Sequence, residues 1–188
     1  MKQVILIGFI GMLLSFSTNA NQRQADVDDA MRQALRNAIE NSDSFADRFD
    51  AEVWLFDKSQ HLERFVKDPE QRLDLLRKIH RSATQAQLRP EWVLAVIEIE
   101  SHFDRFAISH AGAQGMMQVM PFWKKEIGRP DDNLFDLETN LRYGCAILKH
   151  YLERSEGRLA EALARYNGSL GSYRYPEKVM VAWEKRWR

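Results

Sequence analysis

One carboxylate in this sequence stands where acid–base chemistry is possible. The segment Pro90–Ser101 is largely apolar and begins with a proline, whose missing N–H group needs no partner in the first turn of a helix. Glu100 follows Val96 and Ile97 by four and three positions, so a helix places it in an apolar stripe. Apolar surroundings raise the pKa of a carboxyl group, and a carboxylic acid that keeps its proton near neutral pH can act as a general acid. Glu100 is therefore the candidate catalytic acid.

Glu100 has a second interpretation, which periodicity alone leaves open. It lies at the end of the predicted helix, and helix ends are poorly fixed by sequence, so its side chain could instead turn outward and be solvated. The other acids of the segment, Glu91 and Glu98, project from the opposite side of the helix, where we expect solvent. The residues around Glu100 must decide its role.

Three further polar side chains could belong to a site. Gln118 interrupts an apolar stretch after Gly115, and the pair Tyr166 and Asn167 ends an apolar helix just before a glycine. Each has a plain structural alternative. Gln118 could lie on a solvated face, Tyr166 could be a core ring with its hydroxyl at the surface, and Asn167 could cap the helix.

The sequence has no residue pattern typical of a metal site, a catalytic serine or cysteine nucleophile, or a phosphate-binding cofactor site. The five histidines show no pair at ligand spacing, and the single cysteine, Cys145, lies in an apolar run typical of a buried core residue. Asp131-Asp132-Asn133 lacks the order of a calcium loop, and no Gly-x-Ser-x-Gly elbow or phosphate-cradling loop occurs. We therefore expect neither a metal nor a cofactor.

Helices must position these residues, because no segment alternates convincingly as a strand. A thin apolar stripe with a four-residue spacing runs from Val27 to Ile39, and a more apolar stretch covers 51–66. Asp136 is a plausible N-cap. The expected helices cover 69–80, 90–101, 121–127, 136–153, 159–166 and 177–187, with a polar stretch over 81–89. The predicted fold class is mainly α.

The first twenty residues have the pattern of a secretory signal peptide. Lys2 precedes an apolar stretch from Val4 to Phe16, and Thr18-Asn19-Ala20 is a small-residue cleavage site. The apolar stretch is short for a bilayer core of about 30 Å, so we expect cleavage after Ala20 and no stable membrane insertion afterwards. The 27 basic and 27 acidic side chains cancel, which argues against a dedicated nucleic-acid binder.

Four blocks in order give the sequence a family resemblance. They are Glu100-Ser101, the glycine-punctuated block from Ile108 to Gln118, the segment from Leu134 to Asn140, and Tyr166-Asn167. With them the chain resembles the family 1 soluble lytic transglycosylases, which share the goose-type lysozyme fold. Two positions depart from the usual pattern: Met116 stands where leucine is common, and Gly168 directly follows Asn167.

The resemblance covers about residues 88–179 and implies a domain organisation. It predicts a lysozyme-like (goose-type, SLT) helical domain over 86–188, after a signal peptide over 1–20 and an N-terminal helical extension over 21–85. It also implies a peptidoglycan substrate, which suits a protein secreted across the inner membrane into the periplasm.

The implied chemistry assigns both proton transfers to Glu100. As an acid it would protonate the glycosidic oxygen between N-acetylmuramic acid and N-acetylglucosamine. As a carboxylate it would then take the proton of the muramoyl 6-hydroxyl, which attacks its own C1 and leaves a 1,6-anhydromuramoyl end. The resemblance further implies that Tyr166 hydrogen-bonds near Glu100 or the sugar. The implied substrate-binding residues are Ser101, Ser109, Gly115, Met117, Gln118, Tyr166 and Asn167.

Three alternatives remain open. A lysozyme-type hydrolase usually needs a second carboxyl group, and the nearest following acid, Asp104, matches a non-catalytic residue of the family. A binding module could hold glycan without cleaving it. The chain could also be an accessory of an envelope-spanning machine, with residues 21–85 as the element that contacts a cell-envelope protein.

Overall fold

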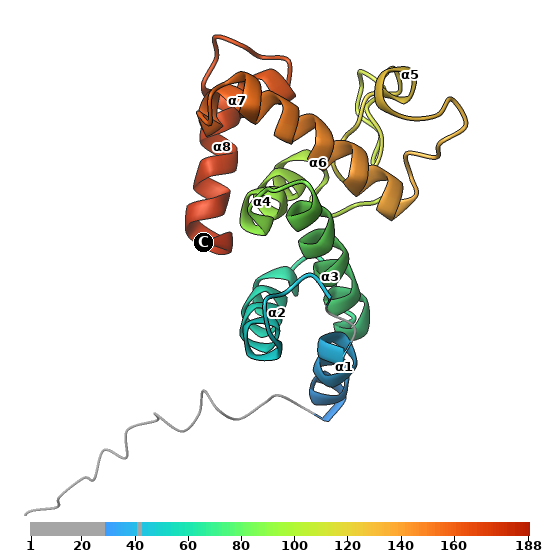
Figure 1. Cartoon of the computed structure of the whole chain (residues 1–188), viewed down its shortest axis with the longest axis vertical. Coiled ribbons are helices and arrows are strands. Elements are labelled where there is room, and N and C mark those ends of the chain that lie inside the picture. Colours follow the sequence, from blue (N-terminus) through green and yellow to red (C-terminus); the bar gives the residue numbers. More distant parts are fainter. Residues whose placement is uncertain (1–28, 41–42) are drawn as a thin grey trace, which may run out of the picture.

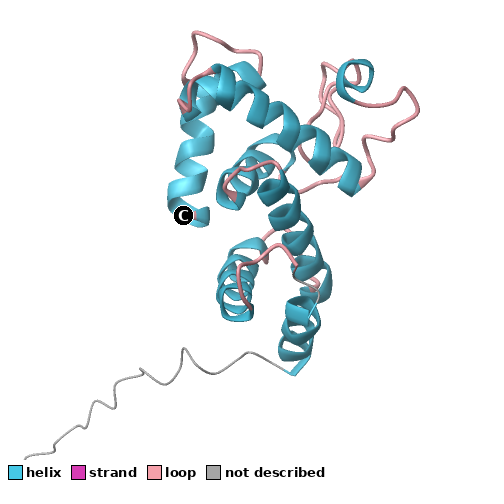
Figure 2. Cartoon of the chain, viewed as in Figure 1, coloured by secondary structure: helices cyan, strands magenta, loops and turns pink. Residues whose placement is uncertain are grey.

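The computed structural model describes residues 29–40 and 43–188, and the elements in these ranges are helices joined by turns (Figures 1 and 2). In chain order they are α1 (Asp29–Glu40), α2 (Arg48–Leu62), α3 (Pro69–Gln85), α4 (Pro90–Ser101), α5 (Trp123–Ile127), α6 (Leu137–Arg154), α7 (Leu159–Tyr166), α8 (Arg174–Ala182) and the π-helical turn η2 (Trp183–Trp187). Pairing of the strand type is limited, within these ranges, to isolated bridges that link Gln114 to Ile108 and Val119. The mainly α prediction is confirmed, whereas the predicted signal peptide lies outside the described residues.

Side-chain caps fix where several helices begin. The predicted N-cap Asp136 accepts a hydrogen bond from the backbone N–H of Thr139 at 2.9 Å, and Asp68 caps α3 in the same way. Helix α4 has the predicted bounds: it begins at Pro90 and ends where His102 adopts the left-handed conformation, with a φ of 51°.

Several predicted helix ends are wrong. Helix α5 begins at Trp123 instead of Pro121. Helix α3 continues past His80 to Gln85, because the polar residues of its last turn surround Ala83, which is fully buried in the core. Helix α8 begins at Arg174 instead of Glu177, which places Pro176 in its first turn, where a missing N–H group removes no helical hydrogen bond.

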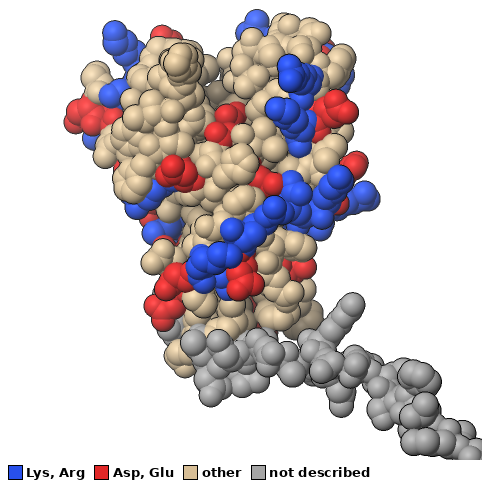
Figure 3. Space-filling view, turned by 180° about the vertical axis from the view of Figure 1, so that it is seen from behind, with Lys and Arg blue, Asp and Glu red and all other residues tan. Residues whose placement is uncertain are grey.

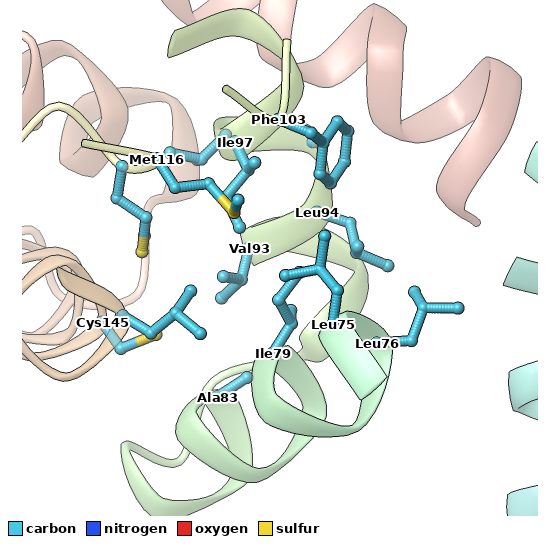
Figure 4. Packing of buried hydrophobic residues seen from close by; sticks show 14 of the residues in the cluster. Leu75, Leu76, Ile79, Ala83, Val93, Leu94, Ile97, Phe103, Met116 and Cys145 are labelled. Atoms are coloured by element: carbon cyan, nitrogen blue, oxygen red, sulfur yellow. The ribbon is translucent and has the colours of Figure 1, made fainter. Parts of the chain in front are cut away.

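Helix α4 lies at the centre of the molecule, against α3, α8 and η2 (Figure 1). Figure 4 shows Leu76 and Ile79 of α3 near Val93 and Leu94 of α4, and all four are fully buried. Burial of this kind stabilises a fold by roughly 1.5–3 kcal/mol for each large apolar side chain. The catalytic candidate therefore projects from the best-buried helix of the fold.

One hydrophobic cluster extends from Leu35 of α1 to Trp187 of η2. The N-terminal helices α1 to α3 thus share a core with the segments that follow. The predicted boundary between residues 85 and 86 does not separate two cores, and the division into an extension and a domain stays a prediction. Cys145 lies in this core as predicted, and burial raises the pKa of its thiol to about 12.

The face of α4 opposite Glu100 is covered, so the prediction that Glu91 and Glu98 face solvent is wrong. Glu98 is 5% exposed and accepts hydrogen bonds from Arg186 Nε at 2.8 Å and Trp187 Nε1 at 2.7 Å. Glu91 accepts one from Trp54 Nε1 at 2.8 Å. The covering residues come from α2 and from the last turn of the chain, which a helical wheel of α4 cannot include.

Candidate active site

The side chain of Glu100 lines a pocket of about 340 Å³ that lies between the end of α4 and the start of α8. The loop between α7 and α8 forms the pocket's other wall. Seen from behind, the molecule is hollowed at the top between the lobe that carries α7 and α8 and the lobe that carries α5 (Figure 3). The lining residues are Ile99, Glu100, Asn167, Ser169, Ser172, Arg174, Tyr175 and Lys178.

The Glu100 carboxyl is held by a single side chain. The hydroxyl of Tyr175 donates a hydrogen bond to Glu100 Oε1 at 2.5 Å, across 75 positions of sequence. Burial raises the pKa of Glu100 to about 7, although the hydrogen bond from Tyr175 opposes that rise. Near neutral pH the carboxyl is thus divided between its acid and its carboxylate form.

Tyr175 remains a donor under the same conditions. Its ring is 9% exposed, and burial together with the nearby charge of Glu100 holds its pKa well above the ordinary value. Because the phenol keeps its proton, the hydrogen bond that it donates to Glu100 becomes stronger when Glu100 becomes negatively charged. The pair can therefore release a proton to a bound molecule and then stabilise the resulting carboxylate.

Sequence reasoning missed Tyr175. The apolar spacing of Tyr175, Val179 and Ala182 indicates a buried face of α8, and all three are buried. That spacing alone places the ring inside the fold. It does not reveal that the hydroxyl reaches Glu100, because α8 and α4 are brought together only by the tertiary structure.

Tyr166 makes no hydrogen bond to Glu100 among the described contacts, and its expected contact with the sugar stays a prediction. Its hydroxyl donates to the backbone carbonyl of Met117 at 2.7 Å rather than to Glu100. Burial, followed by the charge of Glu100, raises its pKa well above the ordinary value, so the ring lies within electrostatic reach of the acid. Tyr166 joins the end of α7 to the loop that precedes α5.

The side chains of Ser101 and Gln118 donate hydrogen bonds to backbone carbonyls of that same loop. Ser101 is 9% exposed, and its hydroxyl donates to the carbonyl of Met116 at 2.7 Å. Gln118 Nε2 donates to the carbonyls of Gly115 at 2.8 Å and Ala107 at 3.1 Å. The bond from Ser101 fastens the loop to the end of α4, next to Glu100, and the two bonds from Gln118 hold the loop in its own conformation.

Gly115 and Met117 are held by Asn140, a fully buried residue of α6. Asn140 accepts a hydrogen bond from the N–H of Met117 at 2.7 Å and donates to the carbonyl of Leu134 at 2.8 Å. Gly115 has a φ of 75°, and a Cβ atom there would lie 2.4 Å from Asn140 Nδ2. Only glycine fits this approach.

Ser109 lies further out on the loop, where its hydroxyl accepts a hydrogen bond from the N–H of Ala113 at 3.0 Å. Of the predicted site residues, only Glu100 and Asn167 line the pocket. The other six, Ser101, Ser109, Gly115, Met117, Gln118 and Tyr166, lie in or against the neighbouring loop. Their contacts with a substrate stay predictions.

In the described ranges, no group of three or more His, Cys, Asp or Glu side chains could hold a metal ion. None of the helices in these ranges combines the length and the apolar character that a bilayer crossing requires.

A family model matches the chain over residues 77–181, which is more than half of its 188 residues, and its description is "Transglycosylase SLT domain". The match begins inside α3 and ends near the end of α8. It therefore includes Glu100, Tyr175 and every residue that lines the pocket.

Curated relatives match a similar part of the chain. The membrane-bound lytic murein transglycosylase F of Desulfosudis oleivorans is 36% identical over 107 residues, which is 54% of this chain and 23% of that protein. The transglycosylase of Enterobacteria phage PRD1 is 33% identical over 109 residues, which is 54% of this chain and 40% of that one. The chain thus spans less than half the length of either relative.

Among solved structures, the 70 kDa soluble lytic transglycosylase of Escherichia coli is 22% identical, with a TM-score of 0.47. That alignment covers 82% of this chain and 25% of the other.

Proposed function

The chain belongs to the transglycosylase SLT domain family, and from this premise we propose that it is a peptidoglycan lytic transglycosylase. It cleaves the β-1,4 bond between N-acetylmuramic acid and N-acetylglucosamine without using water. The observation that carries the proposal is the Glu100 carboxyl, whose pKa is about 7, held by Tyr175 in an open pocket. Glu100 is the only carboxyl group among the described residues that line this pocket.

In the first step Glu100 acts as the general acid. Its proton moves to the glycosidic oxygen while the bond from that oxygen to C1 of the muramoyl residue breaks. The hydrogen bond from Tyr175 strengthens as negative charge develops on Glu100. A catalytic pKa near the operating pH suits this transfer, because enough of the acid form is present and the proton still leaves readily.

In the second step the same carboxylate acts as the base. It takes the proton of the muramoyl 6-hydroxyl, and the oxygen of that hydroxyl forms the new bond to C1. The product is a 1,6-anhydromuramoyl end, the first proton leaves on the departing N-acetylglucosamine hydroxyl, and Glu100 is protonated again by the proton of the 6-hydroxyl. Since the nucleophile belongs to the substrate, orientation replaces a second catalytic carboxylate.

Replacing Glu100 tests the assignment. The variant Glu100→Gln keeps the shape of the side chain but has no proton to transfer, so we expect it to fold and to release no muropeptides from purified sacculi. Glu63→Gln, at an exposed glutamate outside the pocket, is the matched control and should keep full activity. Muropeptide release by Glu100→Gln at the wild-type rate would refute the role of Glu100.

The mass of the products separates the two enzymatic alternatives. Intramolecular attack omits one water, so mass spectrometry should find muropeptides about 18 Da lighter than hydrolysis products. Reducing muramoyl ends would make the protein a lysozyme-type hydrolase. Binding of sacculi without release by the wild-type protein would make it a glycan-binding module.

Secretion into the periplasm is part of the same proposal. It rests on the signal-peptide pattern of residues 1–20 and on the location of the substrate. N-terminal sequencing of the protein from a periplasmic extract should begin at Asn21. An intact Met1 on protein retained in the cytoplasm would contradict it.

A contact between residues 21–85 and a cell-envelope protein is also proposed. Phe49, Val53 and Phe56 share one side of α2 and are 73%, 53% and 36% exposed, which is an unusual stripe of large apolar side chains on a surface helix. In a pull-down, the double variant Phe49→Ser/Phe56→Ser should no longer bind an envelope protein that the wild type binds. Phe106→Ser, at a residue that is 65% exposed in the loop between α4 and α5, is the control.

A further inference from the structure

Two cationic side chains that line the pocket of Glu100 have no partner among the described residues. Arg174 and Lys178 lie one turn apart on α8 and both line the pocket. Neither side chain forms an ion pair or a hydrogen bond with any described residue. The arginines of the neighbouring helix behave differently, because Arg158 and Arg165 both pair with Glu161. The free cations of the pocket are therefore available to a bound anion.

Ser169 supplies a second, independent sign of a ligand. It lies on the loop between α7 and α8 and lines the same pocket. Its hydroxyl oxygen is buried, yet it has no hydrogen-bond partner among the described residues. A buried hydroxyl without a partner destabilises a protein, and a ligand oxygen in the pocket would supply the missing hydrogen bond.

The start of α8 adds to the positive potential. The N-cap residue Tyr173 makes no side-chain cap, and among the described residues the only side-chain acceptor at this start is Ser172 Oγ, 3.4 Å from the backbone N of Arg174. The partial positive charge of the helix N-terminus therefore faces the region of Arg174. Glu100, the acid that lines the same pocket, forms no ion pair with either cation, and its carboxyl instead accepts the hydrogen bond from Tyr175.

We propose that Ser169, Arg174 and Lys178 form a carboxylate subsite that binds the acidic side groups of a peptidoglycan strand. The inference rests on the proposed function and adds a substrate feature to it. The glycan backbone is uncharged, and its acidic groups hang from the lactyl group of each muramoyl residue. They are either the lactyl carboxylate itself or the carboxylates of an attached peptide. Arginine and lysine recognise both through charge-assisted hydrogen bonds.

The test measures binding in a background that cannot cleave. Sacculi are sedimented with Glu100→Gln and with Glu100→Gln carrying Arg174→Gln and Lys178→Gln in addition. We expect the half-saturating sacculus concentration to rise about tenfold, as the loss of two partly exposed charge contacts predicts. The control adds Lys67→Gln and Lys185→Gln instead, which remove the same charge at two exposed lysines outside the pocket and should leave binding unchanged.

Three substrates identify the anion. If an amidase that removes the peptides abolishes the difference, the subsite binds peptide carboxylates. If the difference persists, it binds the lactyl carboxylate. Sacculi whose carboxyl groups have been converted to amides should bind both proteins equally. A tenfold difference on amidated sacculi, or none on native sacculi, would overturn the subsite.

The subsite and the proposed function fail in different ways. A wild-type protein that releases no muropeptides would refute the function, while carboxylate-dependent binding would still uphold the subsite. Release of anhydromuropeptides together with unchanged binding by the cation variants would uphold the function and refute the subsite.

Discussion

At the level of single residues, the ionisation of Glu100 links catalysis to stability. Its pKa is about 7 in the folded protein against an ordinary value of 4.5. Below pH 4.5 the folded and unfolded chains both hold the proton. Between pH 4.5 and 7 the folded state binds more protons, so the free energy of unfolding falls as the pH rises. Above pH 7 the buried charge costs the fold up to about 3 kcal/mol.

Glu100→Gln should therefore stabilise the protein at high pH only. We expect its free energy of unfolding to exceed that of the wild type by about 1–3 kcal/mol at pH 8 and to equal it at pH 4. Urea titrations followed by circular dichroism at the two pH values measure this difference. An equal stability of the two proteins at pH 8 would mean that Glu100 is solvated, as the second interpretation of the sequence had it.

Tyr175→Phe should shift the pH dependence of the reaction. The hydrogen bond from Tyr175 favours the carboxylate, so its loss raises the pKa of Glu100 further above 7. The decline of muropeptide release at alkaline pH should move upward by roughly 0.5–1 pH unit. The maximal rate should fall about tenfold, because the carboxylate loses its donor.

The control for that variant is Tyr173→Phe. Tyr173 is 73% exposed and its hydroxyl forms no hydrogen bond with the described residues, so rate and pH profile should stay unchanged. A lower rate for Tyr175→Phe with an unshifted profile would mean that the ring only fills space.

At the level of elements, the local sequence signals of α4 and α6 were sufficient to predict where these helices begin. Pro90 and Asp136 set those starts through contacts within one turn. The partners of Glu98 and Glu100 could not be predicted in this way. Arg186 lies 88 positions from Glu98 and Tyr175 lies 75 positions from Glu100, so only the packing of α8 and η2 against α4 reveals them. Local periodicity determines which residues face inward, and tertiary structure determines what they meet.

The contact between α4 and η2 includes an ion pair between Glu98 and Arg186. Glu98 is 7% exposed and Arg186 24% exposed in their side chains. Glu98→Gln leaves the guanidinium partly buried without its counter-charge, so we expect a loss of about 2–3 kcal/mol in the free energy of unfolding. Urea denaturation of Glu98→Gln, Arg186→Met and the double variant measures it. The double variant should lose less than the sum of the single losses, and strict additivity would show that the pair does not interact.

At the level of the whole molecule, the sequence predicted a mainly helical fold with one candidate acid, and it predicted a division of the chain between residues 85 and 86. The family resemblance begins near residue 88, which is why the sequence predicts a division there. The apolar stripe of α1 is thin, and such a stripe does not reveal which helices it packs against. In the structure, Leu35 of α1 and Leu55 of α2 belong to the same cluster as Leu163 of α7. Figure 1 shows α3 extending from the N-terminal helices to α4 and α6, so it connects both parts.

A shared core predicts a single unfolding transition. Leu55→Ala in α2 and Leu163→Ala in α7 each remove a fully buried side chain and should each lower the free energy of unfolding by about 2–5 kcal/mol. In both variants the transitions followed by circular dichroism and by tryptophan fluorescence should coincide and shift together, since every probe reports on one cooperative unit. If residues 21–85 formed an independent extension, Leu55→Ala would shift only one of two separate transitions. In that case the catalytic part would stay folded above the lowered transition of Leu55→Ala, and the variant would still release muropeptides there. With a single core, muropeptide release is lost at the temperature at which Leu55→Ala unfolds.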